Sequence, residues 1–406
     1  GDKVLFEKGR VGCMEYPAYV AALDIGGTKI AGALLRYEQI DAAPEVVFET
    51  QVPTQAQRGG GPVLVTVCDV ANTVLAEARS RREQVLGIGV STAGRVDAVT
   101  GGIAYANEIM PGWTGQPIKE RLQESCELPV SVLNDVQAHA LGEARWGAAS
   151  GADTCMMIAA GTGIGGAVIA HGRLVRGNHG FAGEIGHIAC SQAVGIPCVC
   201  GGAGHLELVA SGSGIEARYA EITGNHIDGA EISRRAAEGE PAAHKVIMTA
   251  GIALGEAIAG ITNLLDPDMV VIGGSVPKAG TKWRAAVQEG FERQIPLAQR
   301  GLPILAAELG GHAPLIGAAE DLLDYLEDVE VRQELDEFDD AEGFEALGEP
   351  HEAALVRDQA LVDVVELLDQ GLDAGRGQPS AARLPTLEGV ERDVEQLGEG
   401  FLAEPG

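Results

Sequence analysis

The sequence repeats one local plan, in which an apolar run stops at a glycine-rich turn and a second apolar run follows. In the first copy, residues 19–23 precede the turn Asp24-Ile-Gly-Gly-Thr-Lys29, and residues 30–35 follow it. In the second copy, residues 154–160 and 167–170 flank the turn Gly161-Thr-Gly-Ile-Gly-Gly166. Short apolar runs on either side of glycines predict β-hairpins. We therefore expect two structurally duplicated halves, each built on such a hairpin.

The rest of the first 326 residues predicts alternating strands and helices. The expected elements are two helices, residues 61–82 and 242–265, and three short strands, residues 85–90, 130–133 and 269–272. The second of these strands ends at Asn134 and Asp135, and the third ends at Gly273 and Gly274. This alternation predicts an α/β protein, and 406 residues are enough for two domains and an appendage.

The charge balance excludes several kinds of partner. The chain has 59 acidic and 29 basic residues and a net charge of −30, which repels nucleic acids and anionic lipid surfaces. The uncharged stretch 154–170 is interrupted by glycines and too short to span a membrane, and the N-terminal residues lack an apolar signal core. Seven unevenly spaced cysteines do not suit a disulfide scaffold. We expect a cytoplasmic protein that binds neither nucleic acid nor membrane.

Most of the negative charge lies in residues 327–406, which hold 23 acidic residues and 5 arginines. Apolar residues are sparse there except in 353–368, where five of them could line one helix face: Leu355, Leu361, Val364, Val365 and Leu368. We expect an acidic, partly helical or disordered tail. It is either a solvated appendage or a docking segment for an unknown partner.

Five motifs, in this order and spacing, resemble the ROK family (repressors, open reading frames, kinases). They are Asp24-Ile-Gly-Gly-Thr-Lys29, Leu133-Asn-Asp-Val136, Gly161-Thr-Gly-Ile-Gly-Gly166, Glu184-Ile-Gly-His187 and Cys198-Val-Cys-Gly-Gly-Ala-Gly-His-Leu-Glu207. The resemblance covers about residues 18–326 and implies the actin-like, hexokinase-like ATPase fold, in which two RNase H-type domains close over ATP and a sugar. The implied domains are residues 18–136 with 305–326 returning to them, residues 137–304 with a zinc loop, and the tail 327–406.

The resemblance assigns the glycine turns to the phosphates of Mg-ATP. Glycine suits this role because it has no Cβ and accepts positive φ, so backbone N–H groups can approach phosphate oxygens. Asp24 would orient Mg2+ through water, and Gly273 and Gly274 would lie near the adenosine. The residues expected at the nucleotide are Asp24, Gly26, Gly27, Thr28, Lys29, Gly161, Thr162, Gly163, Gly165, Gly273 and Gly274. Any one of these turns, taken alone, is also compatible with a plain tight turn.

Asp135 is the candidate catalytic base. A hydroxyl that attacks phosphorus must lose its proton, and a carboxylate at the end of a buried strand can accept the proton and align the oxygen. Asn134 would hold a neighbouring sugar hydroxyl. The alternative is that Asn134 and Asp135 cap the helix that follows them, and both roles can coexist.

Sugar hydroxyls are bound by carboxylates, amides and imidazoles held on rigid turns. The family pattern places the sugar-binding groups at Gly94, Arg95, Asn107, Asn134, Asp135, Glu184, His187 and Glu207. The alternative for the glutamates is that they are ordinary surface carboxylates.

His187, Cys198 and Cys200 have the spacing of a structural Zn2+ site, with a tight Cys-x-Cys turn and a distant histidine. In the ROK family a third cysteine usually completes this site, whereas the present chain has His205 at that position. Two thiolates and two imidazoles are an acceptable set for Zn2+. Cys190 is the alternative fourth ligand, and a metal-free turn is the alternative to the whole site. The metal would fix the loop between Glu184 and Glu207.

The segment Ser91-Thr-Ala-Gly-Arg-Val-Asp97 bears on the sugar. In glucokinases of the family the corresponding loop usually has a Pro-Gly pair and an apolar residue, whereas the present loop resembles that of the N-acetylmannosamine kinases. The Arg95 guanidinium could donate to an N-acetyl carbonyl or to a sugar oxygen. The expected reaction is therefore transfer of the γ-phosphoryl group of Mg-ATP to the 6-hydroxyl of N-acetylmannosamine. Glucose is the alternative acceptor, and other hexoses fit less well than these two sugars.

Other classes fit the sequence less well. ROK repressors have a winged helix-turn-helix before the kinase-like body, whereas only about 18 residues precede the first strand here. A catalytically inactive sugar-binding scaffold is disfavoured by Asp135 and the two phosphate turns. Polyphosphate as donor is disfavoured because Thr28 and Lys29 are adjacent, without the extra glycine of relatives that use it. The resemblance implies a homodimer or a homotetramer.

Overall fold

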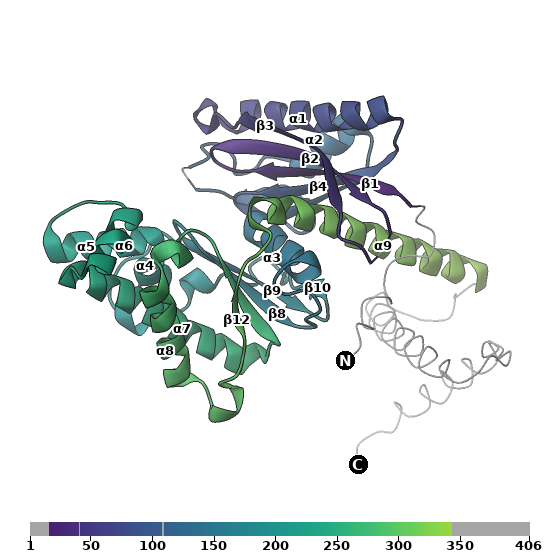
Figure 1. Cartoon of the computed structure of the whole chain (residues 1–406). Coiled ribbons are helices and arrows are strands. Elements are labelled where there is room, and N and C mark those ends of the chain that lie inside the picture. Colours follow the sequence, from purple (N-terminus) through teal and green to yellow (C-terminus); the bar gives the residue numbers. More distant parts are fainter. Residues whose placement is uncertain (1–15, 40, 108, 343–406) are drawn as a thin grey trace, which may run out of the picture. The chain divides into compact units, whose positions relative to one another are not determined.

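The computed structural model describes residues 16–39, 41–107 and 109–342 (Figure 1). The chain divides into two units, residues 1–332 and 333–406, and the first unit holds all the predicted site residues. The amphipathic segment expected at 353–368 lies outside the described residues.

The first unit contains two five-stranded sheets. The first sheet has the strand order β3-β2-β1-β4-β7, and the second has the order β10-β9-β8-β11-β12. The strands of the first sheet are β1 (Ala18–Ile25), β2 (Lys29–Tyr37), β3 (Glu45–Pro53), β4 (Val85–Thr92) and β7 (Val130–Asn134). Those of the second are β8 (Cys155–Ala160), β9 (Ile164–Ala170), β10 (Arg173–Leu174), β11 (Met269–Gly273) and β12 (Ile304–Ala306). A separate two-stranded ribbon pairs β5 (Arg95–Val96) with β6 (Ile103–Tyr105).

The two sheets share one plan, as the repeated sequence pattern predicts. In each, three antiparallel strands are followed by two strands parallel to the first: β4 and β7 after β1, and β11 and β12 after β8. Both begin with a hairpin whose connection is three residues long. The backbone N–H of Gly26 donates to the Lys29 carbonyl at 2.9 Å, and that of Gly161 donates to the Gly163 carbonyl at 2.9 Å.

The second turn is shorter than the sequence predicted. Gly165 and Gly166 were expected in the turn but lie in β9, where Gly165 pairs with Ala159. A Cβ at Gly165 would stand 2.8 Å from the Val136 side chain. Gly165 is therefore required by close packing inside a strand.

Helices cover both faces of each sheet. On the first sheet, α1 (Gly60–Arg81) and α2 (Ile118–Cys126) share a core with Leu23 and Leu34, whereas α9 (Ala313–Glu342) packs on the opposite face with Ala22 and Leu35. Successive residues of one strand thus enter different cores, as the period of a β-strand requires. On the second sheet, α3 (Asp135–Trp146) packs on one face and α4 to α8 on the other. The latter are α4 (Glu207–Ala210), α5 (Gly212–Thr223), α6 (Gly229–Glu238), α7 (Pro241–Leu265) and α8 (Thr281–Gln294).

Six 3-10 turns complete the described elements of the chain. They are η1 (Ala56–Arg58), η2 (Ile185–His187), η3 (Ser191–Ala193), η4 (Val276–Ala279), η5 (Leu297–Gln299) and η6 (Gly310–His312).

Helix α9 continues through the expected start of the acidic tail at residue 327. Tyr325 and Leu326 still pack against the core of the first sheet, and Glu327 and Asp328 form ion pairs with Arg173. The described part of the chain therefore shows no break between the residues before 327 and the first residues of that tail.

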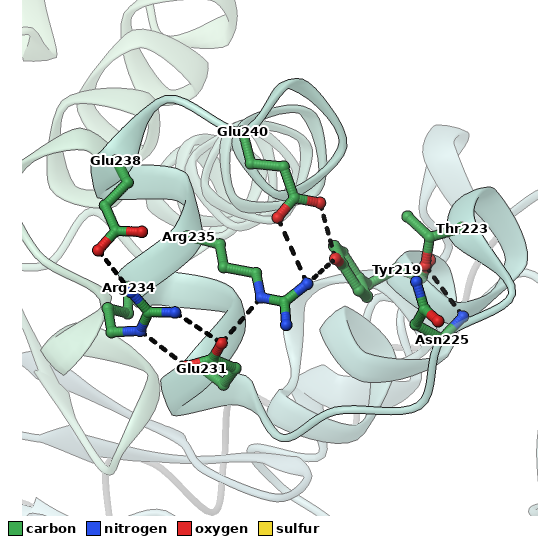
Figure 2. A network of polar contacts seen from close by, with 8 residues as sticks. All are labelled: Tyr219, Thr223, Asn225, Glu231, Arg234, Arg235, Glu238 and Glu240. Carbon is green, nitrogen blue, oxygen red and sulfur yellow. Dashed lines mark hydrogen bonds and ion pairs between the residues drawn. The ribbon is translucent and has the colours of Figure 1, made fainter.

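A polar network joins the outer helices of the second sheet (Figure 2). The buried Tyr219 of α5 donates its hydroxyl hydrogen to Glu240, which precedes α7, at 2.7 Å, and its oxygen accepts a hydrogen bond from Arg235 of α6 at 3.1 Å. Arg235 also donates to Glu231 on its own helix at 2.8 Å. The hydroxyl of a buried tyrosine is thereby satisfied while three helices are connected.

Two helices, α1 and α7, are long and apolar enough to cross a membrane by length and composition alone. Both contribute many side chains to the cores on their sheets, including Val67 and Val74 from α1 and Ile247 and Leu254 from α7. Their apolar character is therefore accounted for by packing inside the protein.

Glu143 of α3 fastens the chain where it returns from β12 to α9. Its carboxylate is 1% exposed and accepts hydrogen bonds from the backbone N–H groups of Ala148, Glu308 and Leu309 at 2.8–2.9 Å. Burial raises the pKa of Glu143, but the nearby His139 imidazole and these N–H groups outweigh it and hold the pKa below its usual range. A buried carboxylate with this many donors is stabilised in its charged form.

Candidate active site

Strand register brings the polar ends of three strands together. Asp24 near the end of β1 pairs with Ser91 of β4, and the next residue of β4, Thr92, pairs with Asn134 at the end of β7. Because β1, β4 and β7 are neighbouring parallel strands, their carboxyl ends meet at one edge of the sheet. Asp135, the first residue of α3, follows directly from this edge.

The first glycine turn is held by hydrogen bonds from Thr54, the residue that follows β3. The Thr54 hydroxyl donates to the Gly26 carbonyl at 2.6 Å, and the Thr54 backbone N–H donates to the Thr28 carbonyl at 3.0 Å. A Cβ at Gly27 would lie 2.7 Å from the Ile109 side chain, so this position accepts no larger residue without movement. The turn is thus preorganised, as a phosphate-binding turn needs to be.

Asp24 and Asp135 interact electrostatically. Burial, together with the negative charge of Asp24, raises the pKa of Asp135 to about 6. Burial also raises the pKa of Asp24, but the hydrogen bond that the Ser91 hydroxyl donates to Asp24 Oδ1 at 2.7 Å and the electrostatic influence of Lys29 and His139 act against the rise. A carboxylate with a pKa near neutrality can accept a proton more readily than an ordinary aspartate.

Asn134 caps α3, which confirms the capping alternative for this residue. Its Oδ1 accepts the backbone N–H of Val136 at 2.9 Å, and Gln137 completes a capping box. Its Nδ2 donates to the Gly94 carbonyl at 2.9 Å. The structure therefore brings Asn134, Asp135 and Gly94 together, and the second hydrogen on Nδ2 is the one that a sugar hydroxyl would have to use.

The second glycine turn lies against the start of α5 and against Glu207. The Glu207 Oε2 accepts the backbone N–H of Ile164 at 2.8 Å. On the other side, the Ser213 hydroxyl donates to the Thr162 carbonyl at 2.6 Å, and the Gly212 N–H donates to the Gly161 carbonyl at 2.8 Å. Glu207, predicted as a sugar ligand, thus supports the predicted phosphate turn with one of its two carboxylate oxygens.

The third glycine turn follows β11. Gly274 has φ +98°, and a Cβ there would overlap the Ala160 carbonyl at the end of β8. A side chain would be strained at this position by both space and backbone angle. A Cβ at Gly273 would lie 3.5 Å from the His139 ring, so this turn adjoins α3 one helical turn after Asp135.

The remaining predicted sugar residues divide into two groups. Arg95 lies on β5 next to Gly94, and Asn107 lies in the loop after β6, where its Oδ1 accepts the backbone N–H of Ile109 at 3.1 Å. Glu184 directly precedes η2 and His187 is its last residue, with Glu184 Oε2 and His187 Nε2 4.0 Å apart. Within the described residues, no recorded hydrogen bond or ion pair joins Asn107 to Glu184 or His187.

Four predicted metal ligands converge in the segment after Glu184. The ligand atoms of His187, Cys198, Cys200 and His205 all lie within 4.8 Å of one another. Cys198 Sγ is 3.8 Å from His187 Nδ1, and Cys200 Sγ is 3.4 Å from His205 Nδ1. Neighbouring sulfur and nitrogen ligands of a tetrahedral zinc are about 3.6 Å apart, given bonds of about 2.3 Å and 2.1 Å, so these four residues fit the ion.

Cys190, the alternative fourth ligand, is not part of this group. It is buried, and its thiol donates to Gln192 Oε1 at 3.1 Å. The geometry therefore favours His205 over Cys190 as the residue that replaces the cysteine usual in the family.

Comparison with known proteins gives the family of the chain, since residues 20–323 match the model of the ROK family. The protein belongs to the ROK family. A glucokinase of Halalkalibacterium halodurans is 34% identical over 314 residues, which cover 74% of this chain and 93% of that protein. An N-acetylmannosamine kinase of Escherichia coli is 32% identical over 300 residues, which cover 73% of this chain and 96% of that protein.

A solved structure with the same architecture is that of a ROK hexokinase from Thermus thermophilus. It has a TM-score of 0.68 and 32% sequence identity, and the match covers 77% of this chain and 99% of that one. These matches confirm the family, the actin-like α/β fold and the class of ATP-dependent sugar kinases that the sequence predicted. The roles of the individual site residues remain predictions.

Four residues of this ROK site were not singled out from the sequence. Thr54 and Ser91 support the first turn and Asp24, His139 lies between Asp24 and the third turn, and Phe181 contacts Arg95. His139 could have been found, because it stands four residues after Asp135 and thus on the same face of a helix. Phe181 and Thr54 could not, since their contacts join segments distant in the sequence.

Proposed function

We propose that this ROK protein transfers the γ-phosphoryl group of Mg-ATP to the 6-hydroxyl of N-acetylmannosamine. The observation that carries the choice of sugar is the state of Arg95. Its guanidinium makes no recorded hydrogen bond or ion pair with any described residue, and its Nε is buried without a partner. Buried donors are costly when unsatisfied, so a ligand acceptor beside Gly94 and Asn134 would stabilise this side chain.

The proposed reaction uses Asp135 as the base. The 6-hydroxyl oxygen forms a bond to the γ-phosphorus, the bond from that phosphorus to the β-phosphate oxygen breaks, and ADP leaves. The hydroxyl proton passes to the Asp135 carboxylate, which is largely ionised at pH 7 because its pKa is about 6. Asn134 would hold the neighbouring hydroxyl through the free hydrogen of Nδ2.

The remaining proposed roles follow the predicted contacts. Bound Mg2+ would neutralise phosphate charge during transfer, and Asp24 beside the first turn would hold it through water. Gly26, Gly27 and Thr28 would offer backbone N–H groups to the phosphates. Glu184 and His187 would bind sugar hydroxyls.

A structural zinc ion at the Cys2His2 group is part of the same proposal. It would hold together the segment from η2 to α4, which carries Glu184 at one end and Glu207 at the other. Zinc in such a closed set of four protein ligands supports folding and takes no part in the reaction. A cytoplasmic location, a homo-oligomeric state and an unknown partner for the acidic tail remain proposals.

Glucose phosphorylation is the second candidate. The 34% identity to a glucokinase that covers 93% of its own length favours it, and an arginine can also donate to a sugar hydroxyl. The two candidate sugars differ in that N-acetylmannosamine offers Arg95 an acyl carbonyl oxygen, whereas glucose offers only hydroxyl groups.

The test is an ADP-release assay with Mg-ATP and glucose, N-acetylmannosamine, N-acetylglucosamine or mannose, comparing kcat/KM. We expect the highest value for N-acetylmannosamine, and we expect Arg95→Ala to remove that preference while glucose turnover changes little. The control is Arg121→Ala, which removes an exposed arginine of α2 that pairs with Glu124. A wild-type preference for glucose would refute the proposed sugar, and no turnover with any hexose would refute the kinase assignment.

A further inference from the structure

Phe181 is a large apolar side chain left 50% exposed beside a predicted sugar ligand. It lies in the loop between β10 and η2, three residues before Glu184. A single exposed apolar residue is common and needs no explanation by itself. The contact that Phe181 makes is what distinguishes it.

The Phe181 ring stacks on the guanidinium of Arg95. The Arg95 Cζ lies 3.5 Å from the centroid of the Phe181 ring and 5.6 Å from that of Tyr105, the cross-strand neighbour of Arg95 in the ribbon β5–β6. Both distances suit cation–π attraction. The Phe181 ring lies against the guanidinium, whose N–H groups all lie in its own plane, so these donors are available at the edge of that plane.

The loop that carries Phe181 is fastened to three parts of the fold. A Cβ at Gly180, which has φ +71°, would be 2.9 Å from the Val96 carbonyl of β5, and one at Gly183, with φ +91°, would overlap the Gly166 carbonyl of β9. Near the start of the loop, the half-exposed Arg176 forms an ion pair with the buried Asp321 of α9. Two glycine positions thus bring the backbone against β5 and β9, which fixes where the Phe181 ring can lie.

We propose that Phe181 is a positioning residue for sugar specificity, which acts by setting the plane of the Arg95 guanidinium. The inference rests on the proposed function, in which Arg95 donates to the acyl carbonyl oxygen of an N-acylated hexosamine. A neutral carbonyl accepts a hydrogen bond only along a limited range of directions, so the orientation of the donor plane matters more than the positive charge. The same loop then supplies both the ring that orients Arg95 and the carboxylate of Glu184.

The test is a double-mutant cycle of Phe181→Leu and Arg95→Ala, read as kcat/KM for N-acetylmannosamine and for glucose. We expect Phe181→Leu to lower kcat/KM for N-acetylmannosamine by about five- to thirtyfold, mainly through KM, as loss of a partly desolvated cation–π contact predicts. The kcat/KM of this variant for glucose should change less than about twofold. The kcat/KM of the double variant for N-acetylmannosamine should be no lower than that of Arg95→Ala. Phe181→Tyr, which keeps an aromatic face, should retain the wild-type preference.

A matched control is available in the chain. Neither Tyr325 of α9 nor Lys119 is a predicted site residue, and the Lys119 Nζ lies 4.5 Å from the centroid of the Tyr325 ring. Tyr325→Leu removes the same kind of contact, and it should leave both kcat/KM values unchanged. Phe181→Leu should change the melting temperature by no more than Tyr325→Leu does.

The outcomes separate the inference from the proposed function. If the effects of Phe181→Leu and Arg95→Ala on N-acetylmannosamine multiply independently, the inference is wrong although the proposed sugar stands. If the wild type prefers glucose, the proposed sugar is wrong and the cycle is measured with glucose: coupling still supports Phe181 as a positioning residue, and independence overturns it. Calorimetric dissociation constants of the sugars without ATP give the same cycle without depending on turnover.

Discussion

Asp135→Asn separates the chemical role of this carboxylate from its effect on stability. The substitution keeps the shape of the side chain and its position at the start of α3, but it removes the negative charge and the ability to accept the substrate proton. A positioned general base contributes about 10²- to 10⁴-fold to a reaction rate, so kcat should fall by about that factor. Asp135 is itself a predicted sugar ligand, but sugar binding should remain measurable, because the asparagine amide can still hydrogen-bond a hydroxyl and Asn134 and Gly94 are untouched.

The effect on stability can be worked out from the pKa of Asp135. Its pKa is about 6 in the folded protein and 3.8 in the unfolded chain, so the folded state disfavours the charged form. Below about pH 4 the group is protonated in both states, and it contributes no difference. Between about pH 4 and pH 6 the Asp135 carboxyl is ionised in the unfolded chain but still largely protonated in the folded one, so the free energy of unfolding falls as the pH rises. Above about pH 6 the full loss of stability is present.

The size of this loss depends on solvent. A shift from 3.8 to about 6 would correspond to about 3 kcal/mol for a fully shielded group. Protein atoms surround the Asp135 carboxylate, but its side chain is accessible to solvent, and water screens part of the unfavourable interaction. We therefore expect Asp135→Asn to be more stable than the wild type by about 1 kcal/mol at pH 8, which is roughly 1–3 °C in Tm.

The assay is thermal unfolding of both proteins without ligands from pH 4.5 to pH 8, together with kcat at pH 7.5. The difference in Tm should be small at the lowest pH, increase up to about pH 6 and then stay constant. A variant that is less stable than the wild type at pH 8, or a difference that does not depend on pH, would contradict the argument from burial and the Asp24 charge. A kcat within tenfold of the wild type would contradict the assignment of the base.

Two further predictions concern other parts of the molecule. Glu143→Gln should lower the free energy of unfolding by about 1–3 kcal/mol at pH 7, because one amide oxygen cannot replace a carboxylate that accepts three backbone N–H groups. Since the pKa of Glu143 is lowered by folding, this difference in the free energy of unfolding should shrink as the pH falls below about 4.5. The surface variant Glu124→Gln should show neither the loss of stability nor its pH dependence. Chemical denaturation of the wild type and the two variants at pH 7 and pH 4 is the measurement. His205→Ala should reduce the zinc content of the purified protein, measured by plasma emission spectrometry, and lower Tm, whereas Cys190→Ser should retain the metal. Equal loss of zinc in both variants, or none in either, would contradict the proposed ligand set.

Local sequence patterns identified much of the fold because they depend on neighbouring residues. The strand 85–90 is present as Val85–Thr92, and the helix 242–265 is present as Pro241–Leu265. The small strand β12 was not predicted, since it has only three residues and its pattern is too short to be recognised. The length of the second turn was also wrong, because glycines inside β9 look like turn residues until the packing of Val136 against them is known.

The candidate site likewise has features that the sequence could identify and features that required the structure. The residues at strand ends, Asp24 and Asp135, could be chosen from sequence, because a polar residue that follows a buried apolar run is a local signal. Their mutual influence could not, because it depends on the register of β1, β4 and β7. The choice of His205 over Cys190 likewise needed the folding of the loop, since spacing alone permitted both.

The sequence by itself determined the repeated hairpins and the family, and it predicted a set of residues for the chemistry, because each depends on residue type and short-range order. Tertiary structure decided the electrostatic and stacking relations among them: the raised pKa of Asp135, the two tasks of Asn134 and the contact between Phe181 and Arg95. Apart from the helix cap, which joins Asn134 to Val136, these relations join residues from about 40 to 110 positions apart in the chain. Charge interactions and hydrogen bonds act through space over a few ångströms, so only the folded chain brings such residues within range of one another.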